Sequence, residues 1–450
     1  MKLYRYLLYG SIWLVFLVLL YIYFPPYLTS GIKDSIDTFL AAPLTYWWFV
    51  FPLVGLLMLL GFVLYYGVHF FASFGSGYKP KITHYENISI MIACKNEKVL
   101  LERTLNSIVE SDYPKDKMQV IVITSGSTDD TTSFATNFSE EHKDIDMIVL
   151  SKDLPKKGKP PALNYGLERV KNDIVILYDS GCILKPNSLK NLISPFHQEK
   201  TEAVIGPVLV KNWKDNMLTR GIFLDYGMVS GGGLLFEVKN RLGSSAYSFG
   251  RNFAVRTKYL EKYGGFNEDS MTEDLYLSVL LNLDGVLIRF SPKAKVYEYV
   301  PNSWDILVKQ RTRWLAGYVF DMPQLMAMKS EYKDGKKLII ARNMTMMVLG
   351  NMDTWLPIEI IFAIFQFLTG EHYMLIWTLS CIFFQLGYIF NSIRKYCDKH
   401  YSLMFYFLIS GFIHLYMFLR QFKLPKEISW EKTPMLLERE EAEILALSNM

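Results

Sequence analysis

The chain has 450 residues, of which 51% are hydrophobic, and its formal charge at neutral pH is +4. This length allows two or three ordinary domains, and the small basic excess argues against a nucleic-acid partner. The four cysteines show no metal-type spacing and indicate no disulfide framework. Such cysteine usage fits a soluble part that faces a reducing cytoplasm.

Two apolar runs near the N-terminus predict membrane-spanning helices. Leu7 to Phe24 and Thr45 to Phe71 approach or exceed the roughly 20 apolar residues that cross a bilayer core. A cleaved signal peptide is the alternative for the first run. It needs a shorter apolar core and a small-residue cleavage site, but Pro25-Pro26-Tyr27 follows instead. We therefore expect two membrane helices within residues 1–80.

Residues 81–337 have an ordinary globular composition, and strands alternate with helices in their first half. The predicted strands are Ile88 to Ala93, Val120 to Thr124, Ile148 to Leu150 and Ile174 to Tyr178, with helices that include Leu100 to Val109 and Ala162 to Val170. This alternation indicates an α/β domain with a mostly parallel sheet, which binds ligands outside the carboxyl ends of its strands. We expect three polar segments to meet there: Ala93 to Glu97, Thr124 to Ser127 and Asp179 to Cys182.

The last third of the chain turns apolar again. Leu338 to Gly350 predicts an interfacial helix, and three further membrane segments are predicted at Met352 to Leu368, Tyr373 to Phe390 and Tyr401 to Leu419. The basic residues between the last two runs, and those after the last run, both indicate the cytoplasmic side. The last run is therefore re-entrant or interfacial, or the tail lies outside despite its charge. We expect an interfacial and membrane region over residues 338–422 and a cytoplasmic or exposed tail over 423–450.

Several motifs that carry polar or charged side chains occur in a fixed order. They are ACKNE (93–97), TSGSTDDTT (124–132), GKPPALNYGL (158–167), YDSGC (178–182), GRNFAVR (250–256), TED (272–274) and QRTRW (310–314). This order resembles the family-2 glycosyltransferases, especially the membrane-embedded processive branch with the cellulose, hyaluronan and chitin synthases. The resemblance runs from about Asn87 to Gly317. It implies a GT-A-type, Rossmann-like mixed-sheet domain inserted between transmembrane helices.

The TED segment predicts a catalytic base. Asp274 opens a helical pattern, and the helix dipole favours an ionised carboxylate there, so we expect it to be charged and ready to accept a proton. The alternative is that Glu273 and Asp274 only stabilise the positive end of the helix dipole and have no catalytic role. The accompanying motifs favour catalysis, and the resemblance implies that Glu273 lies on the acceptor side.

The QRTRW segment predicts a substrate-binding helix face. Gln310, Arg313 and Trp314 share one face, where a guanidinium binds phosphate oxygens and an indole offers a flat surface to a sugar. The resemblance implies that Gln310 and Arg313 line the donor diphosphate while Trp314 stacks on the acceptor. An amphipathic helix on the membrane surface is the alternative. We also expect Lys159 to bind the donor diphosphate; the alternative is that it is an ordinary solvated lysine in a loop. Glu97 is expected on the donor side of the site.

Two departures from the family pattern affect donor binding. Thr124 and Ser125 stand where the family usually has paired aspartates, so a hydroxyl replaces a charged group that recognises the nucleotide base. The usual Asp-x-Asp reads Asp179-Ser180-Gly181. Mg²⁺ or Mn²⁺ often uses one or two carboxylates together with substrate phosphates and waters. We therefore expect Asp179 to hold a divalent cation with the diphosphate.

These observations predict a multi-pass protein of the cell membrane with a cytoplasmic catalytic domain. It would be an inverting glycosyltransferase that moves a sugar from a nucleotide-diphosphate donor to a lipid-linked or growing polysaccharide acceptor. The alternative is a non-catalytic, transferase-like membrane scaffold or binding protein with an impaired metal site. A transporter is disfavoured, because much of the chain is soluble and no inverted halves are visible.

Overall fold

The computed structural model describes residues 37, 40–42, 50–75, 84–198, 200–327, 352–370 and 372–420. The chain divides into a helical unit, formed by residues 1–75 and 352–391, and a sheet unit, formed by residues 76–351 and 392–450. Three predicted segments lie outside the described residues: Leu7 to Phe24, Leu338 to Gly350 and the tail over 423–450.

The sheet unit contains a seven-stranded sheet in the order β3-β2-β1-β4-β8-β6-β9 and a three-stranded sheet in the order β5-β10-β7. The strands of the large sheet are β1 (Ile88–Ala93), β2 (Met118–Ile123), β3 (Asp146–Leu150), β4 (Ile174–Asp179), β6 (Ala203–Ile205), β8 (Phe253–Arg256) and β9 (Arg289–Phe290). Those of the small sheet are β5 (Ile183–Leu184), β7 (Val208–Val210) and β10 (Val296–Glu298). The first four strands are parallel and β8 is antiparallel to both neighbours, which confirms the predicted mixed sheet.

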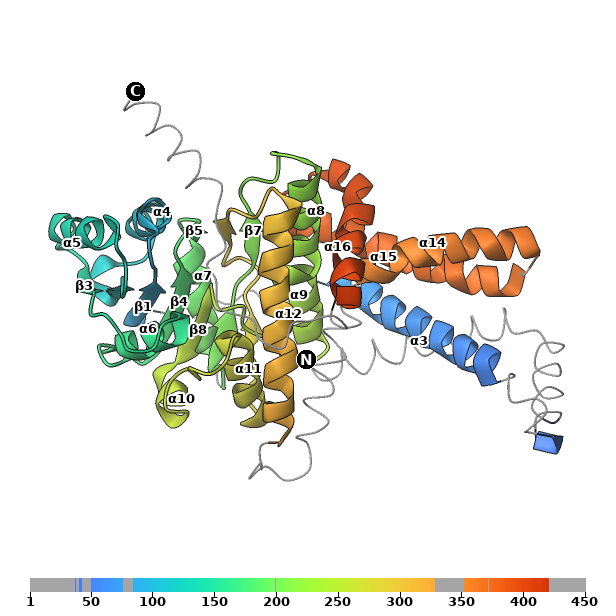
Figure 1. Ribbon diagram of the computed structural model, residues 1–450, viewed down its shortest axis with the longest axis horizontal. Coiled ribbons are helices and arrows are strands. Elements are labelled where there is room, and N and C mark those ends of the chain that lie inside the picture. Colours follow the sequence, from blue (N-terminus) through green and yellow to red (C-terminus); the bar gives the residue numbers. More distant parts are fainter. Residues whose placement is uncertain are drawn as a thin grey trace. The chain divides into compact units, whose positions relative to one another are not determined.

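Strands β1, β2 and β4 are buried apolar runs covered on both faces, as their composition predicts, whereas the edge strand β3 is only partly buried. The covering helices are α4 (Lys98–Val109), α5 (Thr131–Glu141) and α6 (Lys159–Leu167). Figure 1 shows α4 and α5 on one face and α6 on the other, because the strand order reverses direction after β3 and the crossovers stay right-handed. The register pairs Ala93 with both Ile123 and Asp179, so the segments after β1, β2 and β4 leave the sheet at one edge.

The other α-helices of the sheet unit follow the first four parallel strands along the chain. They are α7 (Ser188–Ile193), α8 (Met217–Asp225), α9 (Gly233–Arg241), α10 (Thr257–Lys262), α11 (Glu273–Leu283), α12 (Trp304–Ala327) and α16 (Phe407–Arg420). α8 packs tightly against α16, since a Cβ atom added at Gly221 would lie 2.6 Å from Cγ2 of Ile409. Arg220 of α8 also donates a hydrogen bond of 2.6 Å to the Tyr406 hydroxyl. The segment that follows residue 392 therefore packs as part of the sheet unit.

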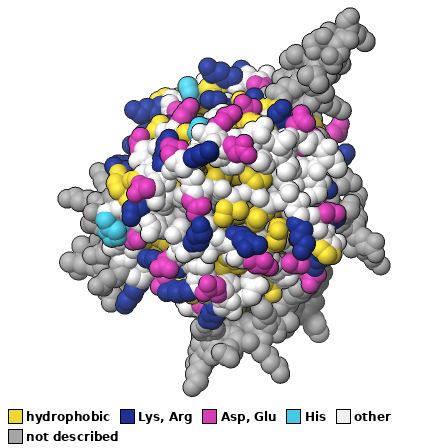
Figure 2. Space-filling model, turned by 90° about the vertical axis from the view of Figure 1, so that its left-hand side faces the viewer, with side chains coloured by type: hydrophobic (Ala, Val, Ile, Leu, Met, Phe, Trp, Pro, Cys, Tyr) yellow, Lys and Arg dark blue, Asp and Glu magenta, His cyan; other side chains and the backbone are white. Residues whose placement is uncertain are grey.

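The face of the molecule shown in Figure 2 carries Lys and Arg side chains interspersed with Asp and Glu. Exposed ion pairs such as Lys115–Asp144 and Lys171–Asp146 join neighbouring surface segments. Pairs of this kind contribute at most about 1 kcal/mol each to the free energy of unfolding. The stability of the sheet unit therefore comes mainly from its buried apolar core.

The helical unit contains α3 (Val50–Ser73), α14 (Met352–Thr369) and most of α15 (His372–Tyr396). Small residues allow α3 and α15 to approach closely: a Cβ atom added at Gly387 would lie 2.2 Å from the Phe70 ring. Asn391 donates a hydrogen bond of 2.8 Å to Ser73 at the end of this contact. Among the described residues, two helical stretches are long and apolar enough to cross a membrane, Met374–Tyr396 and Tyr401–Arg420.

Candidate active site

A cavity of about 410 Å³ lies at the carboxyl ends of β1 and β4, as the sheet topology predicts. The predicted site residues that line it are Glu97, Ser125, Lys159, Asp179, Glu273, Asp274, Gln310, Arg313 and Trp314. Thr124 is placed differently: its side chain is buried, and its hydroxyl accepts a hydrogen bond of 2.9 Å from Thr132. The structure therefore brings together residues that are more than 200 positions apart in the chain.

Lys159 lies among the acidic side chains of Asp179, Glu273 and Asp274. It opens α6, where the two following prolines suit the first helical turn. Its Nζ lies 2.6 Å from Oδ1 of Asp179 and 3.3 Å from Oε1 of Glu273, and it donates a hydrogen bond of 3.0 Å to the Gly250 carbonyl. Burial lowers the pKa of Lys159, but the carboxylates of Asp179 and Glu273 outweigh it and hold the pKa above its usual value. The ammonium therefore stays charged in the cavity.

Asp274 has a raised pKa, contrary to the expectation from the helix dipole. It is the second residue of α11, and its Oδ1 accepts a hydrogen bond of 2.7 Å from the Leu275 N–H. Burial and the adjacent Glu273 raise the pKa of Asp274 to about 7, although Lys159 and the Leu275 N–H act in the opposite direction. Desolvation thus exceeds the dipole, and the carboxyl titrates near neutral pH.

The TED segment is fixed to α12 by a tight polar contact. The Thr272 hydroxyl donates a hydrogen bond of 2.7 Å to Asp321, and the Ser270 hydroxyl donates one of 2.6 Å to the same carboxylate oxygen. A Cβ atom added at Gly317 would lie 2.3 Å from Thr272, so only glycine allows this approach. This contact sets the position of Asp274 relative to the QRTRW face of the same helix.

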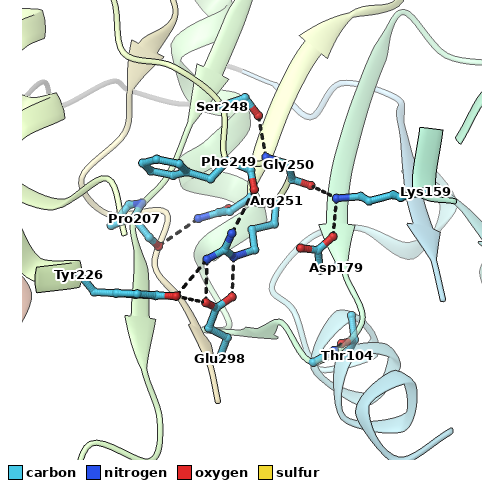
Figure 3. Close-up of polar contacts among 12 residues, drawn as sticks. Thr104, Lys159, Asp179, Pro207, Tyr226, Ser248, Phe249, Gly250, Arg251 and Glu298 are labelled. Atoms are coloured by element: carbon cyan, nitrogen blue, oxygen red, sulfur yellow. Dashed lines mark hydrogen bonds and ion pairs between the residues drawn. The ribbon is translucent and has the colours of Figure 1, made fainter. Parts of the chain in front are cut away.

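Arg251 is a further cavity residue, for which the motif pattern predicts no role (Figure 3). It precedes β8 and is nearly fully buried. Its Nε lies 2.5 Å from Oε2 of Glu298, its Nη2 lies 2.7 Å from Oε1, and the Tyr226 hydroxyl donates a third bond to Oε1 at 2.7 Å. The only sequence feature that points to this residue is its position within the GRNFAVR motif. Its partner lies 47 residues away, and nothing local in the sequence links the two.

A second buried polar network contacts the Trp314 ring through Arg311. The Arg311 guanidinium lies over the Trp314 ring, 4.5 Å from its centroid. Arg311 Nη2 lies 2.6 Å from Oδ2 of Asp225 at the end of α8, and Nε2 of His414 lies 3.0 Å from Oδ1. Burial opposes ionisation, but Arg311 and His414 hold the pKa of Asp225 below its usual range. Within QRTRW, therefore, Arg313 lines the cavity while Arg311 anchors the helix.

The Asp179-Ser180-Gly181 segment fits a divalent cation that takes most of its ligands from the substrate. Asp179 lines the cavity with 36% of its side chain exposed. Ser180 donates a hydrogen bond to Glu97 instead of facing Asp179. Gly181 has φ +94°, and a Cβ atom built on it would point at Leu100, 3.3 Å from Cδ2. One carboxylate completed by diphosphate oxygens and water is a donor set that Mg²⁺ and Mn²⁺ accept.

The Gly181→Asp variant, which restores the Asp-x-Asp pattern, is expected to lower stability without strengthening Mn²⁺ binding. An L-residue at this φ, with its Cβ against Leu100, costs about 1–3 kcal/mol. Thermal unfolding and Mn²⁺ titration of purified protein measure the two effects. Gly285→Asp is the control, because Gly285 also has a positive φ but open space around its Cβ. Tighter Mn²⁺ binding with unchanged stability would contradict this account of the segment.

Sequence comparison assigns the chain to a family. Residues 86–317, about half of the chain, match the family described as "Glycosyltransferase like family 2". The chain belongs to this glycosyltransferase family. The matched region contains every motif from ACKNE to QRTRW.

The chain is also similar to two relatives and to one solved structure. The chain is 32% identical over 235 residues to "Probable glycosyltransferase YdaM" of Bacillus subtilis, which covers 51% of this chain and 54% of the relative. It is 28% identical over 236 residues to the poly-beta-1,6-N-acetyl-D-glucosamine synthase of Staphylococcus epidermidis, with 52% and 54% covered. The matches thus span about half the length of each relative.

The solved structure is a mannosyltransferase from Pyrobaculum calidifontis in complex with GDP-Man and Mn²⁺. It aligns with a TM-score of 0.55 at 19% identity, covering 81% of this chain and 96% of that chain. At this identity the match shows a shared fold. The glycosyltransferase-type mixed-sheet domain predicted from the motif order is therefore confirmed by both the sequence family and the fold.

Proposed function

We propose that this family member is a membrane-bound, inverting glycosyltransferase. It would move a sugar from a nucleoside-diphosphate donor to a lipid-linked or growing polysaccharide acceptor. One observation carries the proposal: a titratable carboxyl, Asp274, shares a cavity with Asp179 and with the cations of Lys159 and Arg313. A base and a set of positive groups are the two components that transfer from a diphosphate requires.

The proposed reaction is a single displacement. The acceptor hydroxyl attacks the anomeric carbon from the side opposite the diphosphate, and its proton passes to a carboxylate oxygen of Asp274. The bond between the anomeric carbon and the diphosphate oxygen breaks, so the configuration inverts. Lys159 and Arg313 stabilise the charge that develops on the leaving diphosphate.

Divalent cation binding is assigned to Asp179. A bound Mg²⁺ or Mn²⁺ supplies further neutralisation of the leaving diphosphate. The structure related in fold contains Mn²⁺ with its nucleotide sugar, which supports this assignment. Lys159, 2.6 Å from Asp179, orients this carboxylate from the protein side.

The acceptor is assigned to the side of the cavity formed by α11 and α12. Trp314 and Glu273 line this side of the cavity, and the Arg311 guanidinium packs against the Trp314 indole. Two described helices are apolar and long enough to cross a membrane, and a relative is named as a polysaccharide synthase. These two observations support a membrane location and an acceptor of the polysaccharide class. A cytoplasmic catalytic domain and a lipid-linked acceptor are further parts of the proposal.

The proposal is tested with purified full-length protein in lipid nanodiscs. Radiolabelled UDP- and GDP-sugars are supplied with Mn²⁺, with Mg²⁺ or with EDTA, and lipid-soluble and polymeric products are counted separately. We expect cation-dependent incorporation from at least one donor. Failure of every donor to give incorporation or released nucleoside diphosphate would instead favour a non-catalytic scaffold.

The pH dependence of the reaction provides a separate prediction. Asp274 acts as a base only when it is unprotonated, and its pKa is raised to about 7. The kcat/KM of the enzyme should therefore rise about tenfold between pH 6 and pH 8 and then level off. Initial rates across this range measure the effect, with Asp274→Glu as the variant that retains a titrating base. A flat profile in the unaltered protein would exclude a base with this pKa.

A further inference from the structure

A second polar cluster lies at the end of β1 opposite the cavity. It consists of His84 and Glu86, which precede the strand, and His197, which ends the short helix η3 (Ser194–His197). One ligand atom from each side chain lies within 4.8 Å of the other two. Oε1 of Glu86 lies 3.1 Å from Nε2 of His84 and 3.8 Å from Nε2 of His197.

These separations fit ligands of a shared metal ion. Two atoms bound at about 2.0–2.1 Å in tetrahedral geometry lie about 3.3 Å apart, and the two measured separations lie on either side of this value. Two imidazoles with one carboxylate favour zinc and neighbouring transition metals over magnesium or calcium. We propose that His84, Glu86 and His197 bind a Zn²⁺-type ion, with a fourth position for water or another ligand.

The surrounding residues hold two of the three ligands in place. The Tyr113 hydroxyl donates a hydrogen bond of 2.7 Å to the Glu86 carbonyl, and the Tyr113 ring packs edge-on against Tyr85. The His197 side chain is only 5% exposed, yet it lines a cavity of about 590 Å³ through which an ion can approach. The His84 side chain is 62% exposed, and its ring stacks on that of His197 with the centroids 4.4 Å apart. The exposed His84 ring would therefore have to rotate out of this stack to share an ion with His197.

This site is distinct from the cation site assigned to Asp179. β1 has six residues, and at about 3.3 Å per residue it separates the two sites by about 20 Å. Their donor sets also differ, because Asp179 offers only oxygen whereas this cluster offers two nitrogens. A metal ion here would join the segment that leads into β1 to the helix η3. Its expected effect is to stabilise the first strand of the sheet.

The experiment measures Zn²⁺ binding by the full-length protein in lipid nanodiscs after treatment with EDTA. A chromophoric chelator competes for Zn²⁺ in the presence of excess Mg²⁺, which saturates oxygen-only sites. We expect one equivalent of Zn²⁺ and an increase in the unfolding temperature on binding. Cobalt substitution is expected to give the visible absorption of a four-coordinate ion.

His84→Gln is the decisive variant, because His84 is exposed and its replacement leaves the core intact. It should weaken Zn²⁺ binding by more than about tenfold and abolish the cobalt spectrum. His142→Gln is the matched control, since His142 follows α5 and is not a member of the cluster, and this variant should bind Zn²⁺ like the unaltered protein. Absence of Zn²⁺ binding to the unaltered protein, or equal binding by His84→Gln, would overturn the proposal.

Discussion

Asp274→Asn is expected to reduce sugar transfer by about 10²- to 10⁴-fold while donor affinity changes little. Asparagine has nearly the same shape as aspartate, but it cannot take the proton from the acceptor hydroxyl. Lys159 and Arg313, to which we assign the diphosphate, remain in the cavity. Initial rates of transfer measure the first effect, and calorimetric titration with the donor found in the nucleotide-sugar screen measures the second.

Asp305→Asn is the matched control for this variant. Asp305 is also the second residue of a helix, α12, but it is exposed and does not line the cavity. Its replacement should leave transfer unchanged. Full activity of Asp274→Asn would remove the base from the mechanism. An equal loss of donor affinity and rate would assign Asp274 to donor binding instead.

Asp225→Asn is expected to lower the free energy of unfolding by about 3–5 kcal/mol. Asp225 is fully buried, and its carboxylate lies 2.6 Å from Nη2 of Arg311 and 3.0 Å from Nε2 of His414. Without this charge the buried Arg311 guanidinium loses its ionic partner and keeps the cost of its desolvation. Because Arg311 also lies over Trp314, the acceptor KM should rise in the protein that remains folded.

Thermal unfolding in detergent micelles measures the loss, with Glu202→Gln as the control. Glu202 pairs with Lys258 at 2.9 Å, but the lysine is 59% exposed, so this change should cost less than about 1 kcal/mol. If the two variants unfolded at the same temperature, the Asp225 network would not stabilise the fold.

The strands and the cleft could be predicted because they depend on local patterns. Buried Ile and Val runs located the parallel strands, and parallel strands end at one edge. This edge is why Glu97, Asp179 and the start of α6 meet. The apolar pattern predicts that α6 starts at Ala162, but the helix starts three residues earlier at Lys159, because Pro160 and Pro161 fit its first turn.

The electrostatic properties of the site could not be predicted in the same way. Whether Asp274 is ionised depends on how deeply Glu273 and its neighbours bury it, and the helix-dipole argument contains no information about burial. The partners of Arg251 and Arg311 are likewise brought close only by the tertiary fold. Residue types and their order predicted where the site lies, whereas its protonation states follow from the packing.

The contact between α8 and α16 has a practical consequence for work on this protein. The family match ends at residue 317, but α16 begins at Phe407 and covers α8 through Ile409 and the pair of Asp225 with His414. A fragment cut at the boundaries of the match would uncover that apolar helix and remove one partner of its buried acid. Attempts to isolate the transferase portion are expected to yield aggregates unless the C-terminal helix is retained.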